Sequence, residues 1–542
     1  MSRPDARQAP SLARIVLGVA LVAALVRFAH LISFYGSPFY LLPPLDGEVY
    51  LLTAKQPIEG VYFQSPGYVH FLKAVLAVWN GMLGFRVVQC LLGTGTAALT
   101  TIIAARVVRN RWWALVAGLA IALCGPLVVV DLWPALESPN TFAHAATCAA
   151  LLAAGSAASR PGAQGRLLYL TLSGVALGAA ILLRPSALLF LPLVAFYLWK
   201  ADPRARRARL ATAALPIGLA LLVVAPVTLH NLESGDRVLV TASGGLNLYL
   251  GNGEGAMGLY RIPDSLPGAG NALSMAEVSQ SVADREVGRH LKPSEVSDYF
   301  FRRTLADVRR APGTWLRLMG KKVLLAINWF EAPCSEDYYL ERSQSRPLQL
   351  AFVTFGLLAP FFALGVLATF FADPRRRDRL LVLAFAAVPM ATTVLYFYLG
   401  RYRLPALPAV AVVAALGGEY LVATARARQR RTMLVCCAIL LATIGVVHLP
   451  LVDFDRSQEY TKLGTAAAQL DRPDEAASAL EHALRYNPDN LRALRNLAVV
   501  RETQHRPADA RALFTTLLTR ATQLHDQRQL AAAEAALRRL PP

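Results

Sequence analysis

Residues 12–34 read LARIVLGVALVAALVRFAHLISF, and their only charged side chains are Arg14 and Arg27. An apolar helix of about 20 residues is long enough to cross the hydrocarbon core of a bilayer. Arg3, Arg7 and Arg14 resemble the basic region of a signal peptide, but no small-residue cleavage site follows the run. The run therefore predicts an uncleaved first membrane span.

Similar apolar runs recur along the 542 residues, of which 55% are hydrophobic and 17% are charged. We predict an all-α membrane protein with about eleven transmembrane helices and external loops. The expected spans are Leu12–Phe34, Phe85–Val107, Trp112–Val130, Ala135–Ala154, Leu167–Leu183, Pro185–Trp199, Leu210–His230, Leu348–Phe371, Leu380–Leu399, Leu404–Val422 and Met433–Leu449.

The formal net charge of +19 could suggest a nucleic-acid partner. The basic residues, however, stand in short clusters between apolar runs, which is how membrane proteins fix their orientation. We therefore expect no nucleic acid among the partners.

The sequence around Arg184 and Pro185 leaves two interpretations open: a hairpin of two short spans or one long kinked helix. With two spans, all the basic clusters lie on the side of the N-terminal arginines. These clusters are residues 106–111, 200–209, 375–379 and 426–431. Because basic loops favour the cytoplasmic side, we adopt the hairpin and predict a cytoplasmic tail over residues 1–11.

This topology places two long segments outside, residues 35–84 and residues 231–347. In the first, Pro66–Val78 has the pattern of an amphipathic interfacial helix. The second is polar and rich in Gly and Pro, and then helical over Pro293–Arg310. Its end, Trp315–Phe330, is apolar on one face and is expected in the membrane interface.

From Arg456 onward, Ala, Leu, Arg and Glu dominate, and a period of about 34 residues appears. Leu463-Gly464 recurs as Leu497-Ala498, and Ala476, Leu480 and Ala483 recur as Ala510, Phe514 and Leu517. With Pro488 at the end of the first unit, this register resembles tetratricopeptide repeats, and Leu524–Leu540 is expected as a cap or part of a third unit. A plain bundle of helical hairpins is the alternative. The sequence thus predicts a membrane domain over residues 12–455 and an external repeat domain over residues 456–542.

Two carboxylates stand close together in the first external segment, Asp46 and Glu48. A general base must be a carboxylate or imidazole within reach of the proton that it takes, and partial desolvation at a membrane surface can tune such a group. Either residue is a candidate base. The alternative is two solvated loop acids.

Other charged residues near the external ends of spans are candidate binding residues. Glu137, close to Asp131, either faces a polar site or stabilises a helix N-terminus. Arg184, Arg401 and Arg403 run against the charge rule for external segments, and the weaker candidate Arg86 belongs with them. Guanidinium groups bind phosphate bidentately, so an anionic lipid phosphate would explain them, with snorkelling to head groups as the alternative.

Other sequence features do not indicate a functional site. Gly253-Glu254-Gly255-Ala256-Met257-Gly258 matches a dinucleotide fingerprint by its letters, but Pro263 and Pro267 interrupt the helix that must follow. The stretch is therefore expected to be an external turn. The six cysteines show neither a disulfide framework nor zinc-ligand spacing.

Several motifs together resemble the GT-C superfamily of membrane glycosyltransferases, in particular the family 39 group of protein O-mannosyltransferases and lipid A aminoarabinose transferases. The resemblance covers roughly Leu12 to Val422. The matching residues are Asp46, Tyr50 and Ala54; Leu183-Arg184-Pro185; Gly244-Gly245-Leu246-Asn247-Leu248-Tyr249-Leu250-Gly251-Asn252; and Arg401-Tyr402-Arg403-Leu404-Pro405. Bacterial members with tetratricopeptide tails look especially similar.

The resemblance implies a sugar donor on a polyprenyl phosphate and transfer outside the cytoplasmic leaflet, with inversion at the anomeric carbon. It implies that Asp46 is the base, that the arginines stabilise the departing phosphate, and that Asn247 and Asn252 bind substrate. Several relatives carry adjacent Asp-Glu, whereas Gly47 separates Asp46 from Glu48 here, so which carboxylate acts stays open. Relatives differ in metal use; we expect no cofactor, and a divalent metal is the alternative.

The leading hypothesis is a bacterial inner-membrane glycosyltransferase acting on a lipid, glycan or protein acceptor in the periplasm. Its periplasmic repeats would hold the acceptor, a protein partner or a second copy. A second hypothesis is a non-catalytic membrane scaffold that recruits partners through its repeats. A transporter ranks last, because no inverted repeat is visible in the sequence.

Overall fold

The computed structural model describes residues 11–158, 163–335, 337–370, 373 and 375–541. Over these residues the chain is built from helices, with isolated β-bridges only at Cys124–Val353 and Leu259–Tyr398. The predicted cytoplasmic tail lies, except for Ser11, outside the described residues, as do Arg3 and Arg7.

The chain forms two compact units. The membrane unit runs up to Leu31 and takes in Leu45–Tyr338 and Ser345–Leu451. The repeat unit combines the chain from Val452 onward with two short segments, Ile32–Pro44 and Tyr339–Gln344. The apolar and repeat patterns gave no sign that these two segments group with the tail.

The membrane unit contains most of the helices. In chain order, its first half is α1 (Leu12–Phe34), α3 (Asp46–Lys55), α4 (Pro66–Val78), α5 (Met82–Val107), α6 (Arg111–Ala122), α7 (Gly125–Val130), α8 (Glu137–Ala157), α9 (Ala163–Leu183), the 3-10 helix η1 (Pro185–Leu189), α10 (Phe190–Ala201) and α11 (Arg206–Glu233). Its second half is α12 (Gly244–Asn252), α13 (Ala272–Val287), α14 (Pro293–Arg310), α15 (Pro312–Ala326), α16 (Tyr338–Gln344, all but its first residue in the repeat unit), α17 (Arg346–Leu350), α18 (Phe355–Thr369), α19 (Arg376–Leu395), the 3-10 helix η2 (Gly400–Ala406), α20 (Leu407–Arg426) and α21 (Arg430–Val447).

Seven helices in the described part of the chain are long and apolar enough to cross a membrane. They are α1, α5, α9, α11, α19, η2 with α20, and α21. Four apolar helices are shorter: α4, α6, η1 with α10, and α18. The chain is therefore a multi-pass membrane protein, while the expected count of about eleven spans is not confirmed.

The difference has local causes. The expected span Trp112–Val130 is divided into α6 and α7, because the chain turns before Gly125-Pro126 and α6 ends at Ala122. The expected span Ala135–Ala154 is helical as α8, but Glu137, Asn140 and His144 dilute its apolar character.

The structure resolves the alternative at Arg184 and Pro185 in favour of two helices. Arg184 has an extended backbone between α9 and η1. Arg166, near the start of α9, forms an ion pair of 3.1 Å with Asp202, which directly follows α10. Since the two outer ends meet, α9 and α10 run antiparallel, and Arg184 lies at the turn.

Small residues let α18 and α20 pack closely against each other. A Cβ atom on Gly365 would overlap the backbone oxygen of Val413, and one on Gly417 would overlap the oxygen of Phe361. Close approach at glycine is typical of helix pairs in membranes. This contact fixes α20, and with it η2, which carries Arg401 and Arg403.

Two helices of the external segments occur where the sequence predicted them, α4 over Pro66–Val78 and α14 over Pro293–Arg310. The Gly-rich stretch at residues 253–258 is a turn, with positive φ at Gly255 and Gly258. Helix α12, which directly precedes this turn, packs on α14, because Gly245 leaves room for the backbone of Ser297.

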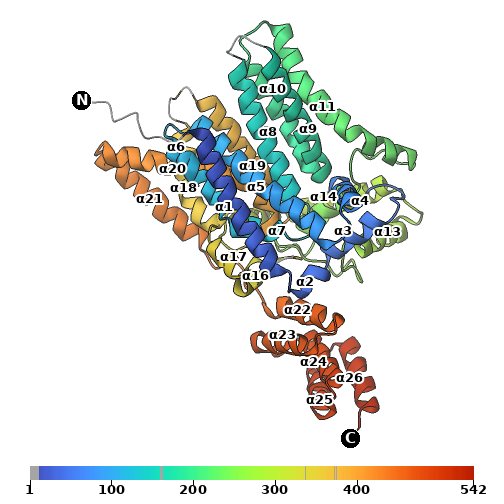
Figure 1. The fold of residues 1–542 in the computed structure, drawn as a ribbon. Coiled ribbons are helices and arrows are strands. Elements are labelled where there is room, and N and C mark those ends of the chain that lie inside the picture. The colour runs from blue at the N-terminus through green and yellow to red at the C-terminus, as the bar shows by residue number, and fades with distance from the viewer. Residues whose placement is uncertain (1–10, 159–162, 336, 371–372, 374, 542) are drawn as a thin grey trace. The chain divides into compact units, whose positions relative to one another are not determined.

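From Val452 onward, the repeat unit is a series of consecutive helices that pack pairwise (Figure 1). These are α22 (Ser457–Gln469), α23 (Pro473–Tyr486), α24 (Leu491–Thr503), α25 (Pro507–Gln523) and α26 (Gln527–Arg539). All the residues that recur in the sequence are buried. Asp471 and His505 occupy equivalent turns and share φ of +56°, so the backbone repeats with the side chains.

Candidate functional site

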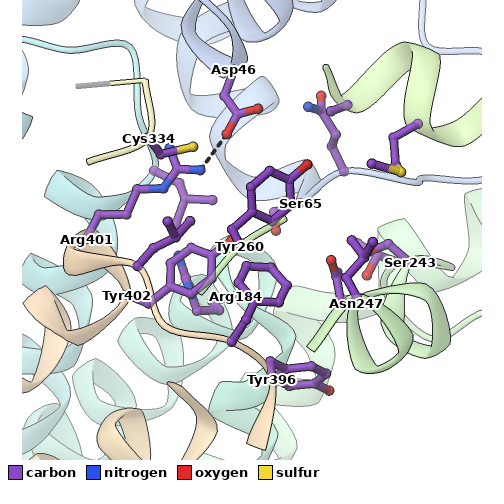
Figure 2. Close-up of a pocket in the computed structure, with 18 of the residues that line it drawn as sticks. Asp46, Ser65, Arg184, Ser243, Asn247, Tyr260, Cys334, Tyr396, Arg401 and Tyr402 are labelled. Atoms are coloured by element: carbon purple, nitrogen blue, oxygen red, sulfur yellow. Dashed lines mark hydrogen bonds and ion pairs between the residues drawn. The ribbon is translucent and has the colours of Figure 1, made fainter. Parts of the chain in front are cut away.

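A pocket of about 270 Å³ lies inside the membrane unit. Its walls come from α3, the start of α8, the turn at Arg184, α12, the end of α19 and η2. Figure 2 shows Arg401 on one side of this pocket and Asn247 on the other. Segments far apart in the chain therefore build one polar chamber.

Asp46 lines the pocket as the first residue of α3. Leu45 before it has φ of +55°, which is unusual for a branched residue and turns the chain sharply into the helix. Asp46 thus stands at a helix N-terminus, where the helix dipole favours a negative charge. Its carboxylate accepts a hydrogen bond of 2.5 Å from Nη2 of Arg401, a contact drawn in Figure 2.

Glu137 connects the two arginines of the pocket. Its Oε1 accepts a 2.8 Å hydrogen bond from Nη2 of Arg184 and lies 3.8 Å from Nε of Arg401. The guanidinium of Arg184 also lies 4.2 Å from the centre of the Tyr402 ring. Two cations and two carboxylates thus share a partly buried chamber, in which charges interact more strongly than in water.

Tyrosines surround this charged group. Burial, with the nearby carboxylates of Asp46 and Glu137, raises the pKa of Tyr50 far above its ordinary value. Burial likewise raises the pKa of Tyr260. Both phenols therefore keep their protons at neutral pH and can donate hydrogen bonds into the pocket.

The structure brings together five of the residues singled out from the sequence: Asp46, Glu137, Arg184, Asn247 and Arg401. Glu48 lies two residues further along α3, is exposed, and is not among the described residues that line the pocket. Of the two candidate bases, only Asp46 faces this chamber.

The remaining three predicted binding residues lie in supporting positions, and none of them belongs to the described lining of the pocket. Arg86 is buried, donates to the backbone oxygens of Leu132 and Met82, and stacks on Phe85. Its guanidinium thus ties α5 to the loop before α8.

Arg403 is also buried and forms a 2.7 Å ion pair with Glu331. It donates to the backbone oxygens of Ala326 and Asn328 as well. Burial raises the pKa of Glu331 although Arg403 opposes this shift. The pair anchors η2 to the segment that follows α15.

Asn252 lies at the end of α12, where its Oδ1 accepts a 2.8 Å hydrogen bond from Nζ of Lys322. Lys322 also donates to the backbone oxygen of Tyr396, a pocket residue, at 2.6 Å. Burial lowers the pKa of Lys322 to about 7. Asn252 and Lys322 therefore fix the end of α19 from behind the pocket wall.

Several lining residues were not predicted from the sequence: Ser65, Ser186, Ser243, Tyr260, Asn271, Cys334, Thr392 and Tyr396. Ser186 directly follows the Arg184-Pro185 step, so the motif could have included it. Thr392 and Tyr396 come from the end of an apolar helix, and the others from irregular loops, where periodicity gives no signal.

The described residues contain no group of three or more His, Cys, Asp or Glu side chains placed to hold a metal ion. The expectation about cofactors stays a prediction.

With this geometry in place, two sequence families match the chain. Residues 14–231 match the family described as dolichyl-phosphate-mannose-protein mannosyltransferase, and residues 461–525 match the tetratricopeptide repeat. The membrane part of this chain resembles that mannosyltransferase family, and its tail carries tetratricopeptide repeats. The mannosyltransferase match contains Asp46, Glu137 and Arg184 and ends before Asn247 and Arg401. No curated protein sequence is significantly similar to the chain.

Several solved structures are partly similar to this chain at low sequence identity. The archaeal oligosaccharyltransferase AglB from Archaeoglobus fulgidus is 12% identical, with a TM-score of 0.45, over 85% of this chain and 59% of its own. The S. cerevisiae protein O-mannosyltransferase complex Pmt1-Pmt2 is 18% identical, with a TM-score of 0.34, over 41% and 34%. ArnT from Cupriavidus metallidurans, bound to undecaprenyl phosphate, is 15% identical, with a TM-score of 0.33, over 76% and 78%.

Proposed function

We propose that this chain is a membrane glycosyltransferase that moves a sugar from a polyprenyl-phosphate donor to an acceptor hydroxyl. The observation that carries the proposal is the pocket in which Asp46 contacts Arg401 beside Glu137 and Arg184. The family match of residues 14–231 supports the same class of activity.

In the proposed reaction, the acceptor oxygen attacks the anomeric carbon of the donor sugar. The bond between that carbon and the phosphate oxygen breaks, and the polyprenyl phosphate leaves with the bonding electrons. Asp46 takes the proton of the attacking hydroxyl, because a general base must lie within hydrogen-bond reach of the proton. A single displacement of this kind inverts the anomeric carbon.

Arg184 and Arg401 are proposed to stabilise the leaving phosphate. Negative charge grows on that phosphate in the transition state, where fixed cationic donors act most strongly. Arg401 contacts Asp46, so a donor phosphate that binds Arg401 would compete with this contact and free the carboxylate. Glu137 keeps both guanidiniums in place and partly balances their charge.

We place this reaction on the periplasmic side of a bacterial inner membrane. The support is the charge distribution, because the basic clusters are all assigned to the opposite side. The repeat domain would then be periplasmic and would hold a protein partner or the acceptor. A periplasmic reporter fused after Asp455 should be active, and a reporter active only in the cytoplasm contradicts this orientation.

The catalytic assignment is tested with Asp46→Asn and the matched variant Glu48→Gln, expressed at equal levels in membranes. Asp46→Asn should abolish sugar transfer, whereas Glu48→Gln should keep it, because the exposed Glu48 lies outside the described lining of the pocket. Full activity in both variants would favour the alternative, a non-catalytic scaffold that acts through its repeats.

A further inference from the structure

A small recess opens beside the pocket, between α8, η1 and α19. Arg184, Ser186, Thr392 and Tyr402 line both the pocket and the recess. The recess measures about 10 Å³, which is the space of a single oxygen atom or water molecule. It therefore extends the pocket by one small polar group.

Asn140 on α8 forms the inner wall of this recess. Its side chain is fully buried, yet neither Oδ1 nor Nδ2 has a hydrogen-bond partner among the residues that the structure describes. One helical turn earlier, Oε2 of Glu137 is equally unpartnered, as is Nε of Arg184. About 90% or more of buried polar groups are hydrogen-bonded to protein or to ordered water, so these groups need a partner from outside the chain.

The neighbours of Asn140 on α8 follow the usual rule. Thr141 donates to the backbone oxygen of Glu137, and Thr147 donates to that of Ala143. His144, which also lines the recess, hydrogen-bonds the backbone oxygen of Asn140 through Nδ1. Among these neighbouring residues of α8, only the amide of Asn140 has no partner among the described residues.

The lining is rich in groups that donate hydrogen bonds. Arg184 and the amide of Asn140 donate N–H groups, and Ser186, Thr392 and Tyr402 carry hydroxyls. Such a set suits an oxygen atom, either a phosphate oxygen or a hydroxyl. Because an apolar side chain would fill this position at no polar cost, the amide is better explained by recognition than by packing.

We propose that Asn140 is a binding residue and that the recess receives one oxygen of the donor's head group. The proposal rests on the proposed function for the identity of the donor. The oxygen belongs either to the lipid phosphate or to a sugar hydroxyl, and two probes distinguish these sources.

The test measures binding of undecaprenyl phosphate and of undecaprenyl-phosphate mannose to the purified full-length protein. Asn140→Leu should bind at least one probe about tenfold more weakly than the wild type, through the loss of hydrogen bonds. A weaker affinity for both probes assigns the oxygen to the phosphate. A loss confined to the mannose conjugate assigns it to a hydroxyl.

Thr141→Val is the matched control, because it removes a buried hydroxyl from the same helix outside the described lining of the recess. It should bind both probes as the wild type does. The unfolding temperature of Asn140→Leu should be unchanged or higher, since an apolar group replaces an unpartnered amide. Asn140→Ala serves if the leucine variant does not fold.

Unchanged affinity of the Asn140 variants for both probes overturns the proposal. This failure is distinct from that of the proposed function, which is decided by transfer in Asp46→Asn. If Asp46→Asn keeps transfer while Asn140→Leu weakens probe binding, the recess stands as a lipid-head-group site and the base assignment falls.

Discussion

Arg401 donates a 2.5 Å hydrogen bond to Asp46, although 355 residues separate them in the chain. Arg401 stands on η2, whose position follows from the tight contact of α18 with α20. Asp46 stands at the start of α3, after the strained backbone of Leu45. The fold thus delivers a carboxylate and a guanidinium to one point from two rigid supports.

The first prediction concerns this contact. Arg401→Gln should lower kcat/KM for sugar transfer by about 100- to 1000-fold, the usual effect of losing one fixed donor to a developing oxyanion. Arg401→Lys should recover only part of this loss, because an ammonium group cannot make the bidentate contact of a guanidinium. Radiolabelled transfer in proteoliposomes measures both variants.

Arg237→Gln is the control, since Arg237 is an exposed arginine of the external segment 231–347 and is outside the described lining of the pocket. In the double variant Arg401→Gln/Asp46→Asn, the loss of kcat/KM should be much smaller than the product of the two single losses, because Arg401 and Asp46 act as a unit. Losses that multiply fully would mean that Asp46 and Arg401 work independently.

A second prediction concerns Glu137, which balances the charge of Arg184 and Arg401. Glu137→Gln removes a buried negative charge beside the proposed phosphate site. Undecaprenyl phosphate should therefore bind about threefold more tightly or better, since opposite charges attract strongly in a poorly hydrated chamber. Transfer should become slower, because the guanidiniums lose their fixed positions.

Thermal shift titration with undecaprenyl phosphate measures the affinity. Glu48→Gln is the control, because it removes an exposed carboxylate of α3. Weaker binding in Glu137→Gln would show that orientation of the arginines outweighs their charge.

The fold followed from the sequence wherever a long apolar run or a repeat left a periodic signal. The helices at Pro66–Val78 and Pro293–Arg310 occur as predicted. The segments Ile32–Pro44 and Tyr339–Gln344 did not reveal their place in the repeat unit, because contacts between distant segments leave no period in either.

The site could be predicted only in part, because short motifs were treated as units. On α3, Asp46 and Glu48 are two residues apart, and side chains at that spacing do not share a face of a helix. The same holds on η2, where Arg401 enters the pocket and Arg403 pairs with Glu331. The motifs could be found in the sequence, but which side chain of each motif faces the pocket depends on how the helices pack.

A third prediction follows for Arg403, a stabilising residue in this geometry. Arg403→Leu removes the cation that pairs with the buried Glu331 and should cost about 3–5 kcal/mol of stability. The double variant with Glu331→Leu should regain most of that loss, because both charges of the buried pair are then removed. Unfolding in detergent, followed by tryptophan fluorescence, gives the comparison.

Arg401→Leu is the matched control, since the side chain of its partner Asp46 is partly exposed in the pocket. Donor binding by the folded fraction of Arg403→Leu should stay close to that of the wild type. A selective loss of undecaprenyl phosphate binding with normal stability would instead place Arg403 in direct contact with the donor.

The last prediction uses Lys322, whose pKa burial lowers to about 7. The unfolded chain keeps the proton of a lysine up to about pH 10.4, whereas the folded protein releases that of Lys322 near pH 7. Between these values the unfolded chain binds more protons, so stability rises with pH across this window and levels off below it. Lys322→Met removes this contribution, and the wild type should gain stability over Lys322→Met as the pH rises from 7 to 10.

Lys321→Met, which removes the exposed lysine next to Lys322, should follow the wild type. Parallel pH curves for the wild type and Lys322→Met would show that the amine keeps its ordinary pKa, and that its hydrogen bonds to Asn252 and Tyr396 come from a charged group at all these pH values.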